Sequence, residues 1–98
     1  MRYTKEQARL RAILADKDHK IRFTRHAEEE MAADQITAPD VVKVLTFGQV
    51  TWFEVKKDEI VHVEGGDVDG RPIRVVVGLQ DSIKVLKVIT AMDRSHKK

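Results

Sequence analysis

The sequence predicts a single α+β domain in which N-terminal helices pack on one face of a four-stranded antiparallel sheet. Apolar residues recur at helical spacing in the first half of the chain and alternate as in strands from residue 50 onward. The connections between the expected strands are too short for parallel crossovers, which favours an antiparallel meander. The 98 residues are too few for two domains, and 42% of them are hydrophobic, which suffices for one core.

The first helix is expected over residues 4–16. It opens with Thr4 and Gln7 in the pattern of a capping box, in which the Gln7 side chain reaches back to the backbone N–H of Thr4. A polar break follows, and residues 21–23 then form a short extended piece. This piece adds a fifth strand if it pairs at an edge of the sheet.

Two further helices are expected before residue 48. The second begins with Thr24 as its N-cap and runs to Asp34, with three consecutive glutamates in the early turns, where the helix dipole favours negative charge. The third begins at Thr37, where Asp40 can complete the cap, and Gly48 is a suitable C-terminal stop.

Four strands are expected in the second half of the chain. They cover residues 50–55, 60–64, 73–79 and 83–90, and an Asp-Gly pair at 69–70 gives the strongest turn signal. The core of this single domain then covers about residues 20–92. The polar residues 93–98 are expected to fray.

Composition and charge exclude several classes of protein. The chain has no cysteine, which excludes disulfides, a thiolate nucleophile and cysteine-ligated metal. No apolar run approaches the roughly 20 residues that a membrane span needs, so we expect a cytoplasmic protein without a membrane partner. The net charge of +2 is spread evenly over both halves, so charge alone does not indicate a nucleic-acid partner.

Three motifs in order suggest a family. They are His26-Ala27 with Met31 four positions on, Gly70-Arg71-Pro72-Ile73, and Val88-Ile89-Thr90. Over about residues 22–91 the chain resembles a family of small bacterial domains of unknown function that carries an HA-x3-M helix start, a G-R-P strand and a V-x-T strand. That family is grouped with the RelE/ParE-like toxins, to which MqsR is similar.

The resemblance implies a RelE-like fold and a function. The chain would be the toxin of a type II toxin–antitoxin system, a metal-independent endoribonuclease that cleaves mRNA, free or on the ribosome. Its partner would be a cognate antitoxin of zinc-finger or helix-turn-helix type. The implied chemistry needs no cofactor.

Histidine and arginine can supply this chemistry, which needs a proton acceptor and a cation at the phosphate. His26 is the first catalytic candidate, because an imidazole near the start of the second expected helix can exchange a proton, with Glu29 and Glu30 one turn further along. The alternative is a structural histidine. His26 with Glu30 offers two metal ligands but lacks a third, so we expect no metal site.

Arg74 is the second catalytic candidate. Strand alternation sends it to the face opposite its apolar neighbours, where a guanidinium can hold a phosphate. The alternative is a cross-strand salt bridge to Glu54 or Glu64.

Four residues are secondary candidates for RNA contacts: Arg71, Lys87, Thr90 and His62. His62 faces away from its valine neighbours and so shares the face of Arg74, although it can equally be structural. Alternation places Thr90 on the side of Leu86 and opposite Lys87. Arg71 can instead stabilise the turn, and Thr90 can simply favour β structure.

A different class of function stays open. The chain could be a non-catalytic module that uses the sheet to bind a protein. The weak net charge favours this alternative, as do the acidic second helix and the Ala91-Met92 end of the last strand, where members of the family have an aromatic residue. If Trp52 is exposed, it suits either base stacking or an antitoxin interface.

Overall fold

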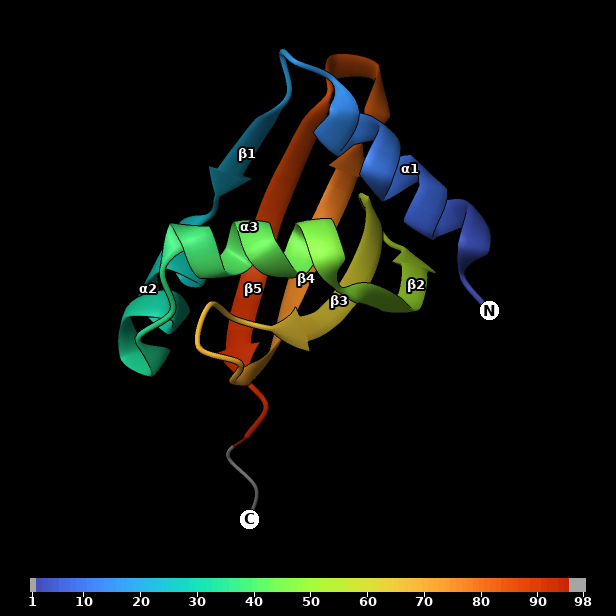
Figure 1. The fold of residues 1–98 in the computed structure, drawn as a ribbon. Coiled ribbons are helices and arrows are strands. Elements are labelled where there is room, and N and C mark those ends of the chain that lie inside the picture. The colour runs from blue at the N-terminus through green and yellow to red at the C-terminus, as the bar shows by residue number, and fades with distance from the viewer. Residues whose placement is uncertain (1, 96–98) are drawn as a thin grey trace.

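The protein is described by a computed structural model that covers residues 2–95 (Figure 1). The elements in chain order are α1 (Thr4–Ala15), β1 (Lys20–Phe23), α2 (Arg25–Asp34), α3 (Ala38–Phe47), β2 (Gln49–Val55), β3 (Glu59–Gly66), β4 (Pro72–Gln80), a short 3-10 turn η1 (Asp81–Ile83) and β5 (Val85–Asp93). The predicted α+β class is confirmed. Each expected element is present, with bounds shifted by no more than a few residues.

The five strands form one sheet in the order β1-β5-β4-β3-β2. Strands β2 to β5 are the predicted antiparallel meander. Strand β1 is the fifth strand, and it pairs with β5 in parallel. Short connections excluded parallel pairing only between neighbouring strands. The segment between β1 and β5 is most of the chain, long enough for a parallel pair.

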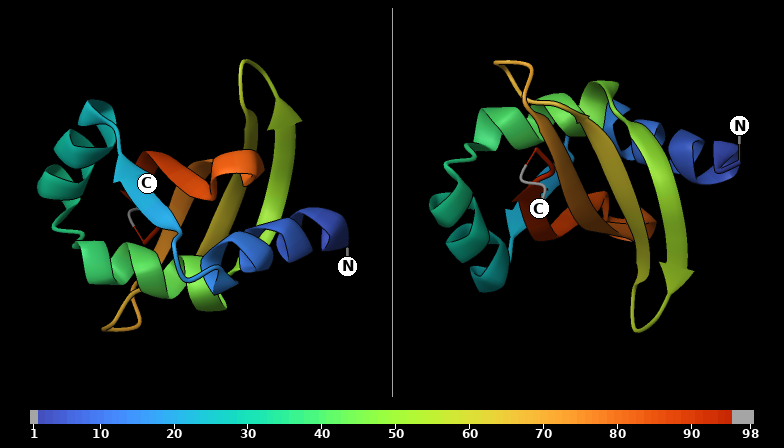
Figure 2. Two further views of the ribbon diagram at one scale, coloured as in Figure 1. Left: turned by 90° about the horizontal axis from the view of Figure 1, so that it is seen from above. Right: turned by 90° about the horizontal axis from the view of Figure 1, so that it is seen from below.

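The helices cover one face of the sheet. Helix α3 packs on β3 and β4, α1 on β2, and α2 on β5, as the two views of Figure 2 show. The residues beneath them are fully buried and alternate along the strands: Val61, Val63, Ile73, Val75, Val77, Leu86 and Val88. Within residues 2–95 no helix lies across the opposite face, which we call the open face.

The helix caps agree with the sequence in two of three cases. The Thr24 hydroxyl accepts from the N–H of Ala27, and Thr37 with Asp40 forms a capping box. The predicted box at Thr4 is wrong, because the N-cap is Tyr3, whose side chain makes no capping hydrogen bond. Gln7 instead uses its amide across the fold: its Oε1 accepts from the backbone N–H of Val50 at 2.8 Å.

A β-bulge changes which side chains of β5 share a face. The register shifts so that Val76 pairs with Thr90 and Val77 with Val88, which leaves Ile89 as the extra residue. Thr90 therefore lies on the open face, not on the side of Leu86 as simple alternation predicted. Lys84 lies outside the strand, with a left-handed φ of 56°.

The strand at the C-terminal end of the chain extends further than predicted. The expected frayed tail was 93–98, but β5 extends to Asp93 and Ser95 donates to the Asp93 carboxylate. Arg94 pairs with Glu64 at 2.6 Å. Residues 96–98 lie outside the described residues.

Arg71 ties the loop between β3 and β4 to α2 and β5. Its Nε donates to Asp67 Oδ2 at 2.9 Å, and its Nη1 lies 3.2 Å from Asp93 Oδ2. The backbone carbonyls of Asp34 and Gln35 accept from the guanidinium at 2.7 and 3.1 Å. All three guanidinium nitrogens therefore donate inside the protein.

Acid should destabilise the fold through Asp40 and Asp67, which are 4% and 2% exposed. Burial raises the pKa of each carboxyl group, but hydrogen bonds from backbone N–H groups and, for Asp67, from Arg71 outweigh it and lower both values. A lowered native pKa gives stability that is present above the ordinary value of 3.8 and lost as the pH falls through the native value. Urea unfolding across a pH series should show this loss.

The control is Asp69→Asn, since Asp69 is an exposed carboxylate of the same loop. It should leave the pH dependence as in the wild type, whereas Asp67→Asn should flatten it. Equal slopes for all three proteins would contradict the assignment.

Within residues 2–95, no helix has the length and apolar character to cross a bilayer.

Candidate functional site

Polar and aromatic side chains gather on the open face where β2, β3 and β4 lie side by side. Trp52 pairs with His62 across β2 and β3, and Glu64 pairs with Arg74 across β3 and β4. These four residues and Thr51 line one cavity of about 340 Å³. The sequence prediction that His62 shares the face of Arg74 is confirmed.

Glu64 holds two arginines at this site. Its Oε2 accepts from Arg74 Nε at 3.0 Å and lies 2.9 Å from Arg74 Nη2. The same oxygen accepts from Arg94 Nη1 at 2.6 Å and from the Thr51 hydroxyl at 3.4 Å. Glu54 and Glu64 were the two predicted salt-bridge partners of Arg74, and in the structure Arg74 pairs with Glu64.

His62 lies beside this pair in a partly buried position. Burial, together with the positive charge of Arg74, lowers the pKa of its imidazole, against the opposing influence of Glu54 and Glu64. A lowered pKa keeps the ring neutral at neutral pH. A neutral ring can accept a proton.

Trp52 presents an aromatic surface to solvent. Its side chain lies on the edge strand β2 and is 48% exposed, whereas Phe53 packs against the core. The open face therefore offers an indole ring beside an imidazole and a guanidinium. This combination suits a planar base next to a phosphate.

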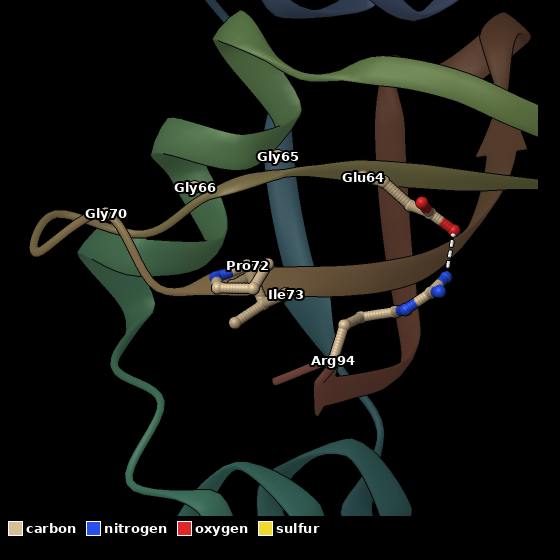
Figure 3. Close-up of a pocket in the computed structure, with 7 residues that line it drawn as sticks. All are labelled: Glu64, Gly65, Gly66, Gly70, Pro72, Ile73 and Arg94. Carbon is tan, nitrogen blue, oxygen red and sulfur yellow. Dashed lines mark hydrogen bonds and ion pairs between the residues drawn. The ribbon is translucent and has the colours of Figure 1, made fainter. Parts of the chain in front are cut away.

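A second cavity adjoins the first across Glu64. It has a volume of about 390 Å³ and is lined by Glu64, Gly65, Gly66, Gly70, Pro72, Ile73 and Arg94 (Figure 3). In Figure 3 the Arg94 side chain extends to the Glu64 carboxylate, while the glycines leave one side of the cavity as bare backbone. Sequence reasoning missed Arg94 because it placed this residue in the tail.

Lys87 and Thr90 lie on the open face of β5. Lys87 pairs with Gly78 and its Nζ lies 3.2 Å from Asp58 Oδ2, while Thr90 pairs with Val76. Lys87 lines a separate cavity with Arg22, Phe23, Thr24 and Gln80. The structure thus puts Lys87 and Thr90 on the face of Arg74 but outside its cavity.

His26 stands apart from these residues. It lies on α2, its side chain is 62% exposed, and its Nε2 is 3.4 Å from Glu30 Oε2 in the next turn. It is not among the residues that line the cavity of Trp52 and Arg74. The two residues singled out as catalytic from the sequence do not share a cavity.

Arg71 also lies outside the cavity of Arg74. Its guanidinium is engaged by Asp67, Asp93 and two backbone carbonyls, as described above. The role visible in the structure is the turn-stabilising one. Its predicted RNA contact stays a prediction.

Comparison with known proteins matches most of the chain to a family model. Residues 23–93 match the model of a family described as Domain of unknown function (DUF4258). No curated protein and no solved structure matches the chain significantly. The match covers α2, α3 and all of the antiparallel sheet, and it includes every residue of the two cavities around Glu64 except Arg94, which lies one residue beyond it.

Proposed function

The chain belongs to this family of domains of unknown function, DUF4258, and from that premise we propose that it is the toxin of a type II toxin–antitoxin system, a metal-independent endoribonuclease that cleaves mRNA. The observation that carries the proposal is the cavity in which Trp52, His62 and Arg74 lie together. Single-stranded RNA offers bases to an aromatic ring and phosphates to a guanidinium. The open face supplies both kinds of group within one cavity.

Two residues of the cavity, His62 and Arg74, have roles in the proposed reaction. The neutral imidazole of His62 accepts the proton of the 2′-hydroxyl as the 2′-oxygen attacks phosphorus. The bond to the leaving 5′-oxygen breaks, that oxygen takes up a proton from water, and a 2′,3′-cyclic phosphate forms. Arg74 holds the phosphate oxygens as negative charge builds on them. Side chains fill these roles without a metal ion.

Induced expression of the wild-type chain without its antitoxin should arrest growth and degrade mRNA. His62→Ala should abolish both effects, because loss of a general base typically lowers the rate by about 10² to 10⁴. Northern blots of abundant messages and cleavage of a labelled RNA by purified protein measure the effect. A wild-type chain that neither arrests growth nor cuts RNA would refute the proposal.

His26→Ala separates the structure-based assignment from the sequence-based one. Cleavage that falls in His26→Ala but persists in His62→Ala would place the base on α2. His19→Ala is the matched control, because His19 bonds to the Asp16 carbonyl at the end of α1, away from both sites. The pH profile gives a second readout: the wild-type rate should begin to fall only below the ordinary histidine pKa of 6.5.

One observation favours the second candidate function, a non-catalytic protein-binding module. Arg74 is already paired with Glu64, and the exposed Trp52 beside it would suit a protein interface as well as a base. The partner of the toxin would be the cognate antitoxin of zinc-finger or helix-turn-helix type, whereas the binding module would dock another protein on the sheet. Co-purification with the product of a neighbouring gene, with no cleavage of RNA by the free chain, would favour the binding module.

A further inference from the structure

The carboxylate of Glu64 gathers positive charge at one point. Both arginines and the Thr51 hydroxyl converge on Oε2, at distances from 2.6 to 3.4 Å. No hydrogen bond of the described residues reaches the other oxygen. Arg74 and Arg94 therefore form an anion-binding site, and the protein's own Glu64 carboxylate is the anion bound in it.

An oxygen of a phosphodiester is the chemical equivalent of this carboxylate oxygen. Guanidinium groups bind carboxylate and phosphate in the same forked geometry and with similar distances. The three side chains are accessible to a ligand, since Arg74 and Glu64 are each 30% exposed and Arg94 is 38% exposed. An external phosphate can therefore replace Glu64 without unfolding any element.

Space is available on both sides of the carboxylate. The cavity with Trp52 and His62 lies on one side, and the cavity with the three glycines and Pro72 lies on the other. Glu64 lines both. A single phosphate at this point would have room for one nucleoside on each side, which is the arrangement of a dinucleotide step in single-stranded RNA.

We propose that Arg74 and Arg94 form the binding site for one phosphodiester of single-stranded RNA, and that Glu64 occupies this site as an internal competitor until RNA displaces it. The proposal rests on the RNA-directed function above and adds the bound group and its regulation. Binding breaks the two ion pairs of Glu64 and forms two new ones to phosphate. Glu64 thereby lowers the affinity of the resting protein for RNA and for other anions.

The test is Glu64→Gln, which removes the competing charge and keeps the shape of the side chain. Its affinity for a short single-stranded oligoribonucleotide should rise about tenfold, because a negative charge within hydrogen-bond distance of the bound phosphate is gone. Trp52 is the only tryptophan of the chain, so quenching of its fluorescence measures binding at the proposed site. Circular dichroism checks that the variant is folded.

The matched control is Glu54→Gln. Glu54 lies on the same face, is 34% exposed and pairs loosely with Lys56 at 3.9 Å, so this variant carries the same charge change away from the arginines. Its affinity should stay within about twofold of wild type. An equal rise in both variants, or none in either, would overturn the proposal.

Two further measurements identify the ligand and test whether Arg94 is the second arginine of the site. Adding Arg94→Gln to Glu64→Gln should return the affinity to near the wild-type value; a gain that survives this change would overturn the two-arginine site. Inorganic phosphate at the oligonucleotide concentration should not compete, and if it does, the site takes free phosphate instead of RNA.

This experiment and the test of the proposed function can fail separately. Tighter RNA binding by Glu64→Gln, with no cleavage by any variant, would support the anion site and refute the proposed enzyme activity. Cleavage that depends on His62, with no change of affinity in Glu64→Gln, would support the proposed enzyme and refute the anion site.

Discussion

Replacing Arg74 with alanine should lower the rate of RNA cleavage about a hundredfold, which corresponds to a loss of about 2.7 kcal/mol of transition-state stabilisation. The proposed reaction concentrates negative charge on the phosphate, and Arg74 is the guanidinium that shares a cavity with His62. The free energy of unfolding should change by less than about 1 kcal/mol, because the lost ion pair is partly exposed and Glu64 keeps its bond to Arg94. Single-turnover cleavage and urea unfolding measure the two quantities.

Two further variants sharpen this result. Arg74→Lys keeps the charge but loses the two-point geometry, so it should recover only part of the rate. Arg25→Ala removes an arginine that is 92% exposed on α2 and should change neither quantity. Unchanged cleavage together with a destabilised Arg74→Ala would show that Arg74 serves only its salt bridge, as the binding-module hypothesis predicts.

The face of Arg74 could be predicted because β4 is regular. Strand alternation requires only the sequence 73–77, and no bulge interrupts the pairing of this strand with β3. The same reasoning placed His62 correctly, since His62 and Arg74 both lie between valine or isoleucine neighbours that face the helices. In a regular ladder, the sequence alone therefore predicts on which face of the sheet each side chain lies.

The position of Thr90 could not be predicted, because it depends on a bulge. Ile89 is β-branched and apolar, as a regular strand residue would be, and nothing in its type marks it as the extra residue of β5. Beyond Ile89 the alternation is reversed. Arg94 was missed for a related reason, since a polar tail and the ordered end of a strand look alike in composition.

Long-range polar contacts also could not be predicted from the sequence. Gln7 had the spacing of a capping box, but its amide satisfies backbone groups of Gly48 and Val50 at the edge of β2. Local spacing identifies an available partner, whereas tertiary packing decides which partner is used. The same holds for His26, whose family motif predicted catalysis although His26 does not line the cavity of Arg74.

Arg71→Ala should be the most destabilising substitution among those considered, with a loss of about 3 kcal/mol in the free energy of unfolding. Arg71 is the guanidinium beside Asp67 and Asp93, whose side chains are only 3% and 6% exposed. Removing one partner of a buried ion pair typically costs about 3–5 kcal/mol, and the partial exposure of Arg71 places the expected loss at the lower end. Urea unfolding at neutral pH, followed by circular dichroism, gives the value.

The size of this effect follows from the number of segments that Arg71 joins. The alanine variant loses the bonds to the β3–β4 loop, to the end of α2 and to the end of β5 at once. Arg71→Lys restores one charge but cannot reach all of these acceptors, so it should recover only part of the stability. Arg25→Ala is again the control, with an expected change below about 0.5 kcal/mol. A loss in Arg71→Ala no larger than in that control would mean that the loop is held by its backbone turn alone. In that case Arg71 would be free to serve as the RNA contact predicted from the sequence.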